Sequence, residues 1–283
     1  MQQASTAGRP AIVLGGGGVL GACQVGMMRA LLEHGILPGL VVGTSVGAIN
    51  GAALAADPTV DGAKKVAGLW SALAEDGMFG DMFTRAETLA RSRTHLYSPA
   101  PLRGLVSAHV PATFADLKIP FQCVAASIER AGAHWFDSGS LQDAVMASAA
   151  VPGLLPPVQI DGEHFIDGGL VHPVPVGRAV ALGACEIYVL DIGRAGQPLQ
   201  PPKSLWNVFL TSIELSRRHR FVEEMANLPD QVRVHLLPTG EEKLPLLSMG
   251  TKSARKNGKA VAARIERGYQ AAADYLATRA RQA

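Results

Sequence analysis

Ser45 lies at the centre of the segment that is best suited to chemistry. It is the third residue of Gly43-Thr44-Ser45-Val46-Gly47, which fits the pattern Gly-x-Ser-x-Gly. In this pattern the serine occupies a sharp strand-to-helix turn, and Gly43 and Gly47 remove side chains that would clash. A strand at Leu40–Val42 and a helix at Val46–Ala56 are predicted around it, so the hydroxyl would stand at a helix N-terminus that favours a developing anion. The alternative interpretation is an ordinary tight turn capped by a serine.

A glycine-rich turn, Gly15–Gly18, follows the apolar run Ala11–Leu14. Consecutive glycines leave backbone N–H groups unshielded, so this turn is predicted to form an oxyanion hole. The predicted donors are Gly16, Gly17 and Gly18. The same run also matches the dinucleotide-binding pattern G-x-G-x-x-G, which expects an acidic residue about 20 positions later. The next strand instead runs into Gly43-Thr44-Ser45, without Asp or Glu, and this favours the oxyanion hole.

A serine hydroxyl needs a base within hydrogen-bond reach, because at its free pKa it is a poor nucleophile. The residues that could supply this base are the eight histidines and the aspartates at predicted strand ends. Asp167 follows a short apolar run and precedes Gly168 and Gly169, so its carboxylate is expected in an open turn. From these residues alone, a turn whose Asp side chain satisfies its own loop is the preferred interpretation.

The composition narrows the class of protein. Hydrophobic residues make up 48% of the 283 residues and charged residues 18%, with a net charge of +2, which allows a large core and does not favour nucleic-acid binding. Three widely spaced cysteines argue against a disulfide framework and for a reducing, cytoplasmic compartment. No apolar run approaches about 18 residues, so no membrane-spanning helix is expected. No Cys/His cluster has the spacing of metal ligands, and neither a metal nor an organic cofactor is expected.

The elements that must position these residues alternate along the chain, which predicts an α/β sheet with helices on its faces. The predicted strands are Ala11–Leu14, Leu40–Val42, Phe121–Ser127, Ala133–Phe136, Val158–Ile160, His164–Ile166, Ile187–Asp191 and Val232–Leu237. The predicted helices are Val19–His34, Val46–Ala56, Gly62–Glu75, Ala86–Ser92, Pro101–Ala108, Leu141–Ala149, Val176–Leu182, Leu205–Met225 and Ala254–Arg281. After a flexible tail at 1–9, a single domain is expected over 10–283, with its motifs in 10–195 and a helical and strand completion in 196–283.

Four blocks occur in the order and approximate spacing of the patatin-like phospholipase family, which the chain resembles over about residues 10–195. These blocks are Gly16-Gly17-Gly18-x-x-Gly21, Gly43-Thr44-Ser45-Val46-Gly47, Ala147-Ser148-Ala149-Ala150-Val151-Pro152-Gly153 and Asp167-Gly168-Gly169. The resemblance implies a three-layer α/β/α fold with a mostly parallel central sheet. It also implies a carboxylic ester hydrolase that acts on acyl esters of lipids, of phospholipase A, lysophospholipase or esterase type.

The resemblance further implies a Ser-Asp dyad without a histidine and a covalent acyl-serine intermediate. Ser45 is then the nucleophile, Asp167 the general base and Gly16–Gly18 the oxyanion hole. The supporting turns contain Gly43, Gly47, Gly168 and Gly169. Any membrane contact is expected to be peripheral, at the apolar faces of Trp70–Phe83 or Leu205–Met225, although such faces are more often part of a core.

The chain departs from the family pattern at three positions. Leu20 and Met146 stand where many members carry a basic residue, and His172 stands where members often have asparagine. His172 is five residues past the implied base, so an assisting role is conceivable, but a turn histidine held by Pro173 is the favoured interpretation.

Two other functions remain open at this point. One is an α/β-hydrolase with a Ser-His-Asp triad, in which His219 or His235 would serve. The other is a nucleotide-binding module that uses the glycine-rich turn.

Overall fold

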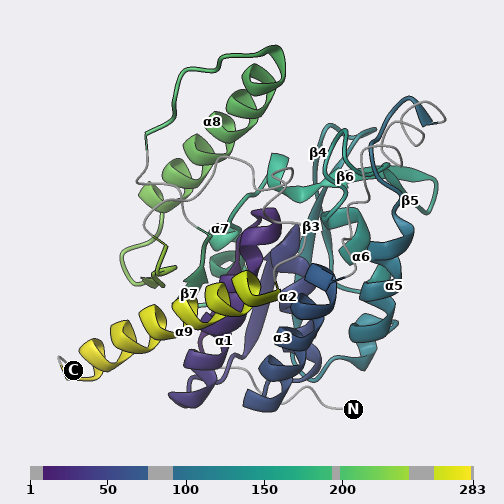
Figure 1. Cartoon of the computed structure of the whole chain (residues 1–283). Helices are drawn as coiled ribbons and strands as arrows, with labels where there is room; N and C mark the ends of the chain where they lie inside the picture. The colour runs from purple at the N-terminus through teal and green to yellow at the C-terminus, as the bar shows by residue number, and fades with distance from the viewer. Residues whose placement is uncertain (1–8, 76–91, 193–197, 242–257, 282–283) are drawn as a thin grey trace.

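The centre of the molecule is an eight-stranded sheet, seen in a computed structural model that describes residues 9–75, 92–192, 198–241 and 258–281 (Figure 1). The strand order is β5-β6-β3-β2-β1-β7-β8, and β4 pairs with β3 off this path. The strands are β1 (Ala11–Leu14), β2 (Leu40–Thr44), β3 (Phe121–Ser127), β4 (Gly132–Phe136), β5 (Val158–Ile160), β6 (Glu163–Asp167), β7 (Glu186–Leu190) and β8 (Arg233–Leu236).

The pairs from β3 through β2, β1 and β7 to β8 are parallel, whereas β4, β5 and β6 join by antiparallel pairing. All four residues of β1 are buried. Such continuous apolar runs are typical of parallel strands that helices cover on both faces. The predicted α/β class and the mostly parallel central sheet are therefore confirmed.

Helices cover both faces of this sheet. They are α1 (Ala22–Glu33), α2 (Val46–Ala56), α3 (Val60–Glu75), α5 (Ala100–His109), α6 (Leu141–Ser148), α7 (Val176–Ala181), α8 (Leu205–Ala226) and α9 (Gly258–Ala280). Short 3-10 turns in the described residues are η1 (Gly18–Gly21), η2 (Phe114–Asp116) and η3 (Gly168–Leu170). The core has two parts, because alternate strand residues face opposite sides of the sheet.

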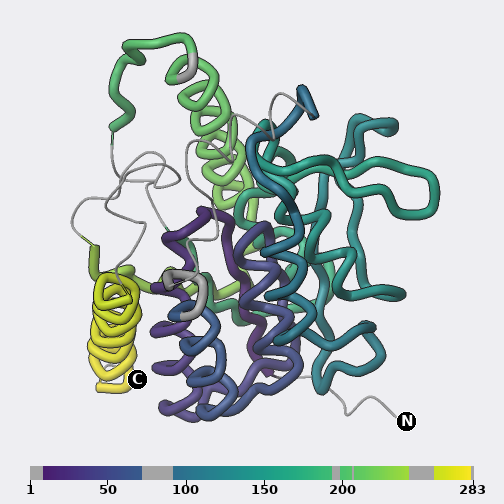
Figure 2. The backbone as a smooth tube through the Cα atoms, turned by 45° about the vertical axis from the view of Figure 1, so that its right-hand side comes forward, coloured from purple at the N-terminus to yellow at the C-terminus, as the bar shows by residue number. Residues whose placement is uncertain are grey.

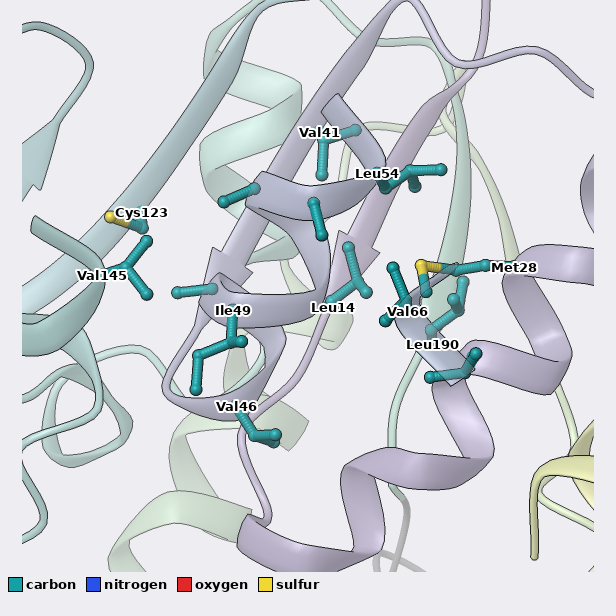
Figure 3. Packing of buried hydrophobic residues seen from close by; sticks show 14 of the residues in the cluster. Leu14, Met28, Val41, Val46, Ile49, Leu54, Val66, Cys123, Val145 and Leu190 are labelled. Atoms are coloured by element: carbon teal, nitrogen blue, oxygen red, sulfur yellow. The ribbon is translucent and has the colours of Figure 1, made fainter. Parts of the chain in front are cut away.

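The larger part of the core lies under α1, α2, α3, α5, α6 and α9. Figure 3 shows strand residues such as Leu14 and Leu190 meeting Ile49 of α2 and Met28 of α1. The smaller part joins the other face of the sheet to α7 and to Phe221 of α8. The helices on one face, the sheet and the helices on the other face are the three layers that were predicted.

Helix α9 packs directly on α1. In Figure 2, α9 (yellow) lies on the other side of the molecule from the β5–β6 hairpin. A Cβ added at Gly26 of α1 would lie 2.0 Å from the carbonyl oxygen of Ile265, and one added at Gly268 would lie 2.4 Å from that of Cys23. The two backbones can approach this closely only because both positions are glycine.

Most predicted elements occur with shifted ends. Strand β2 extends through Thr44, and the predicted helix at Val19–His34 opens as the 3-10 turn η1 before α1 begins at Ala22. The strand at Phe121–Ser127 and the hairpin around Asp161-Gly162 occur as predicted. Three predicted segments lie partly outside the described residues: the tail 1–9 over 1–8, the helix Ala86–Ser92 over 86–91 and the last helix over 254–257. The single domain stays a prediction. In the described parts of the chain, every helix is too short or too polar to cross a bilayer.

Candidate active site

Ser45 occupies a strained turn between β2 and α2. Its backbone has φ 57° and ψ −125°, a left-handed conformation that costs a non-glycine residue about 1–3 kcal/mol. A Cβ at Gly43 would lie 2.4 Å from the Gly47 carbonyl oxygen, and a Cβ at Gly47 would lie 2.3 Å from that of Leu14. Both glycines are therefore required on steric grounds. The Ser45 N–H donates to the buried Ser148 Oγ at 2.9 Å, which ties the turn to α6.

The Ser45 side chain points away from α2 and toward Asp167. Its Oγ donates to Asp167 Oδ2 at 2.6 Å, and within the described chain it makes no capping bond to α2. The second carboxylate oxygen, Oδ1, accepts from the Gly169 N–H at 2.7 Å. The structure therefore brings the two residues together and gives no support to the capped-turn interpretation.

Asp167 is almost fully buried, and burial raises its pKa because it disfavours the charged carboxylate. The hydrogen bond from Ser45, the positive charge of Arg217 and the bond from the Gly169 N–H oppose this effect in that order. The net direction remains upward, so this carboxylate is a stronger base than an exposed aspartate.

The register of the sheet explains how two residues 122 positions apart meet. Thr44 pairs with Val124 of β3, and Asp167 pairs with the next residue, Ala125. Strand β3 continues to Ser127, beyond the end of β2, and β6 returns antiparallel along that extension. Strand β6 therefore ends at the level where β2 ends, although the two strands run in opposite directions.

The turn after β6 also depends on close approach. A Cβ at Gly168 would lie 2.0 Å from the Val124 carbonyl oxygen, and one at Gly169 would lie 2.8 Å from Asp167 Oδ1. These contacts explain why glycines follow the aspartate.

The glycine-rich turn lies beside Ser45, but its three amides are not equivalent. The Gly16 N–H donates to the Pro173 carbonyl at 2.9 Å, so it is already used inside the protein. Within the described residues, the Gly17 and Gly18 N–H groups have no protein acceptor. Of the three predicted donors, Gly16 therefore has its N–H engaged within the protein, whereas Gly17 and Gly18 remain candidates.

A buried polar network that sequence reasoning missed supports this turn. Gln24 Nε2 donates to the carbonyls of Gly15 and Leu190, both at 2.8 Å. Asn50 Nδ2 donates to Gln24 Oε1 at 2.9 Å, and Trp70 Nε1 donates to Asn50 Oδ1 at 3.0 Å. The available signal was a single amide side chain in the apolar first half of α1 and another in the otherwise apolar helix α2.

An apolar pocket opens next to Ser45. The empty space that it encloses, together with the open solvent at its mouth, is about 740 Å³. The wall includes Gly18, Leu69, Trp70, Leu102 and Leu154. Trp70 therefore belongs to the pocket, while the remainder of the predicted Trp70–Phe83 face from 76 onward lies outside the described residues.

The predicted amphipathic helix occurs as α8, but its apolar residues do not form one core face. Leu205 is 88% exposed, and several other apolar side chains of α8 are also exposed. From the opposite side of the helix, Arg217 Nη2 donates to the Gly16 carbonyl at 2.9 Å. This contact to the glycine-rich turn was not predicted.

The candidate histidines lie elsewhere. His172 places Nε2 3.3 Å from Arg220 Nη2 and packs with a tilted ring against Trp135. His235 Nε2 lies 3.1 Å from Glu186, on the side of β1 that faces away from β2 and Ser45. The exposed His219 lies beside Glu223 of its own helix. In the described part of the chain, none of the three bonds to Ser45 or Asp167, so the geometry does not favour a Ser-His-Asp triad. Nor does any group of three His, Cys, Asp or Glu side chains there have the arrangement of a metal site.

Known proteins are similar to this chain over the segment that contains these residues. A profile of the patatin-like phospholipase family matches residues 12–180. Lysophospholipase nte1 of Aspergillus terreus is 32% identical over 191 residues, which cover 64% of this chain and 12% of that protein. Patatin-like phospholipase domain-containing protein 7 of Mus musculus is 31% identical over 186 residues, or 65% of this chain and 13% of that protein. The chain thus spans about an eighth of the length of these relatives.

Among solved structures, VipD from Legionella pneumophila has a TM-score of 0.51 at 16% identity, over 95% of this chain and 67% of that one. This is a likeness of fold alone. The profile match covers more than half of the sequence and includes both Ser45 and Asp167. The chain therefore belongs to the patatin-like phospholipase family.

Proposed function

We propose that this protein hydrolyses carboxylic esters of lipids, with Ser45 as the nucleophile and Asp167 as its general base. The observation that carries the proposal is the 2.6 Å hydrogen bond from Ser45 Oγ to Asp167 Oδ2 in a buried site beside an apolar pocket. Relatives named as lysophospholipases support a lipid ester as the substrate class.

In the first half of the reaction, Asp167 accepts the Ser45 proton while Oγ attacks the ester carbonyl carbon. The N–H groups of Gly17 and Gly18 stabilise the resulting oxyanion, and one such donor contributes about 3–4 kcal/mol to the transition state. The intermediate collapses, the C–O bond to the leaving group breaks, and Asp167 returns the proton to the departing alcohol or lysolipid. The acyl group remains on Ser45.

In the second half, water gives a proton to Asp167 and attacks the acyl carbon. Collapse of the second tetrahedral intermediate releases the fatty acid, and the proton returns to Ser45 Oγ. The raised pKa of Asp167 suits both steps, because an exposed aspartate with a pKa near 3.9 would be a weak base at neutral pH. The rate is therefore expected to rise with pH as Asp167 loses its proton.

The apolar pocket is the proposed site for the acyl chain. Burying one CH₂ group contributes about 0.8 kcal/mol, which corresponds to roughly fourfold in kcat/KM. A series of p-nitrophenyl esters should therefore show kcat/KM rising by about this factor per CH₂ until the pocket is filled. A flat series would remove the pocket from this role.

The decisive experiment compares p-nitrophenyl ester hydrolysis by the wild type, Ser45→Ala and Asp167→Ala. Both variants should fold, as circular dichroism would show, and both should lose nearly all turnover. Asp230→Ala is the matched control, because this aspartate is exposed and remote from the dyad. Strong residual activity in either dyad variant would remove that residue from its proposed role.

Two further measurements separate the alternatives. Retained activity in a His219→Ala/His235→Ala double variant would exclude a triad built on either residue. Covalent labelling of Ser45 by a fluorophosphonate, without a thermal shift from NAD or NADP, would exclude a nucleotide-binding module.

A further inference from the structure

Arg217 of α8 holds the turn that contains the proposed oxyanion donors. Figure 1 shows α8 above α7, and the helix also contacts η3, the turn that follows Asp167. Arg217 Nη2 donates to the Gly16 carbonyl at 2.9 Å across 201 residues of sequence. With the Gly16 N–H bound to Pro173, both polar backbone groups of Gly16 are fixed.

This bond sets the direction of the next amide. A trans peptide unit is planar, so the N–H of Gly17 points opposite to the C=O of Gly16. Arg217 binds the carbonyl on one side of the turn and therefore directs the Gly17 N–H to the other side. Among the described residues nothing accepts that N–H, which leaves it available to an oxyanion.

The guanidinium also lies against the loop that carries the base. A Cβ at Gly169 would lie 3.5 Å from Arg217 Cζ, and one at Gly16 would lie 3.3 Å from its Nη2. Within the described residues no carboxylate lies within ion-pair distance of Arg217, and its Nε is buried without a hydrogen-bond partner. A positive charge therefore stands beside the dyad, where it acts on the Asp167 carboxylate without a close ion pair.

The sequence makes this contact significant. Leu20 stands in the glycine block, which carries no basic residue of its own, and its side chain is only 1% exposed, in the larger core. In this chain a cation reaches the same turn from α8, outside the segment that the family profile matches.

We propose that Arg217 is a positioning residue for ester hydrolysis, which orients the Gly17 N–H through the Gly16 carbonyl and keeps a positive charge beside the dyad. The inference rests on the proposed function of Ser45 and Asp167. Arg217 does not touch the reacting atoms; it acts through the turn and through its charge.

The charge gives a readout that a purely structural role would not move. Arg217 is the charged group that lowers the pKa of Asp167 against the larger effect of burial. Ser45 donates to the carboxylate, whereas His172, Arg220 and Glu224 interact with one another farther along the α8 interface. Removing the arginine charge should therefore raise the pKa of Asp167 and move the acid limb of the kcat/KM profile to higher pH.

The test compares Arg217→Met, Arg217→Lys and the control Arg233→Gln by ester hydrolysis and fluorophosphonate labelling across pH. Arg233 is a suitable control because it removes the same charge from a side chain that is 72% exposed on β8. Arg217→Met should lower kcat by about 10- to 100-fold, a part of the loss expected for a missing oxyanion donor, and should shift the acid limb upward. Arg217→Lys should keep the wild-type acid limb but lower kcat several-fold, because an ammonium lacks the planar fork of a guanidinium.

A folded Arg217→Met variant with kcat within twofold of wild type and an unchanged acid limb would overturn the inference. If that variant does not fold, Arg217→Lys decides, and kcat within twofold of wild type would overturn the positioning role. If the wild type neither hydrolyses esters nor reacts with the fluorophosphonate, the proposed function fails and this inference fails with it. An active wild type with an equally active Arg217→Met variant refutes the role of Arg217 alone.

Discussion

Replacing Ser148 with alanine should damage the nucleophile turn without touching the dyad. The Ser148 hydroxyl is fully buried and accepts the N–H of Ser45 at 2.9 Å. Alanine keeps the Cβ but leaves that N–H buried without a partner, which costs about 1–3 kcal/mol. For a chain of this size, the melting temperature should fall by roughly 2–4 °C per kcal/mol.

The larger effect is expected in catalysis. Ser45 stays at its left-handed φ of 57° because its surroundings hold it there, and the bond to Ser148 is one of the restraints. When the turn relaxes, the Oγ moves relative to Asp167, and a displacement of about 1 Å can cost about 10²-fold in rate. We expect kcat for Ser148→Ala to fall by about 10- to 100-fold, with a smaller change in KM.

Ser127 supplies a matched control. It is also a buried serine, its hydroxyl donates to Glu163, and it accepts the N–H of Arg130 at 3.1 Å. Ser127→Ala should lower the melting temperature by a comparable amount and leave kcat unchanged. Melting curves and p-nitrophenyl ester kinetics on both variants test this. The reasoning is refuted if Ser148→Ala keeps kcat within twofold of wild type, or if both variants lose kcat equally.

Three further predictions concern the base, the helix contact and the pocket. Because the pKa of Asp167 is raised, its buried charge lowers the stability of the folded protein as pH rises, so Asp167→Asn should melt above wild type at pH 7–8. Melting scans should show this difference in melting temperature closing toward pH 3.8, the unperturbed pKa. A difference that does not change with pH would contradict this. Gly26→Ala should lower the free energy of unfolding in denaturant by about 1–3 kcal/mol, because its Cβ would meet the Ile265 carbonyl. Gly104→Ala on α5, whose Cβ would point into open space, should raise the free energy of unfolding by about 0.5–1 kcal/mol. A change of the same sign in both variants would argue against the close α1–α9 contact. Leu102→Trp should partly fill the pocket and shift the preferred ester to a shorter chain, and an unchanged chain-length series would show that the acyl group lies elsewhere.

The parts of the site that could be predicted from sequence are those fixed by local backbone requirements. Gly43 and Gly47 flank Ser45 because of contacts within a few residues and with the adjacent strand, and such needs leave a short motif. The strand Phe121–Ser127 and the hairpin around Asp161-Gly162 were likewise predictable, because apolar periodicity and turn residues are local signals. The choice of Asp167 as the partner needed the family resemblance, since the residues alone favoured a self-satisfied turn.

The remaining features depend on contacts between distant segments. The use of the Gly16 N–H could not be predicted, because its acceptor, Pro173, lies more than 150 residues away. In the sequence, Arg217 is one of several basic residues on a predicted solvent-facing helix. Its contact with the glycine-rich turn is seen only in the folded chain. Gln24 and Asn50 carry a faint signal, but periodicity does not say that their amides meet.

The hairpin of β5 and β6, which pairs with the part of β3 that extends beyond β2, limits the insertions and deletions that the chain can tolerate. Extra residues in the Asp161-Gly162 turn would lengthen a surface loop and leave the pairing of Asp167 with Ala125 unchanged. A two-residue deletion within β6 would instead shift the carboxylate by about 7 Å along the strand, out of reach of Ser45. Length variation among homologues should therefore gather at the tip of this hairpin and be absent from its inner strand.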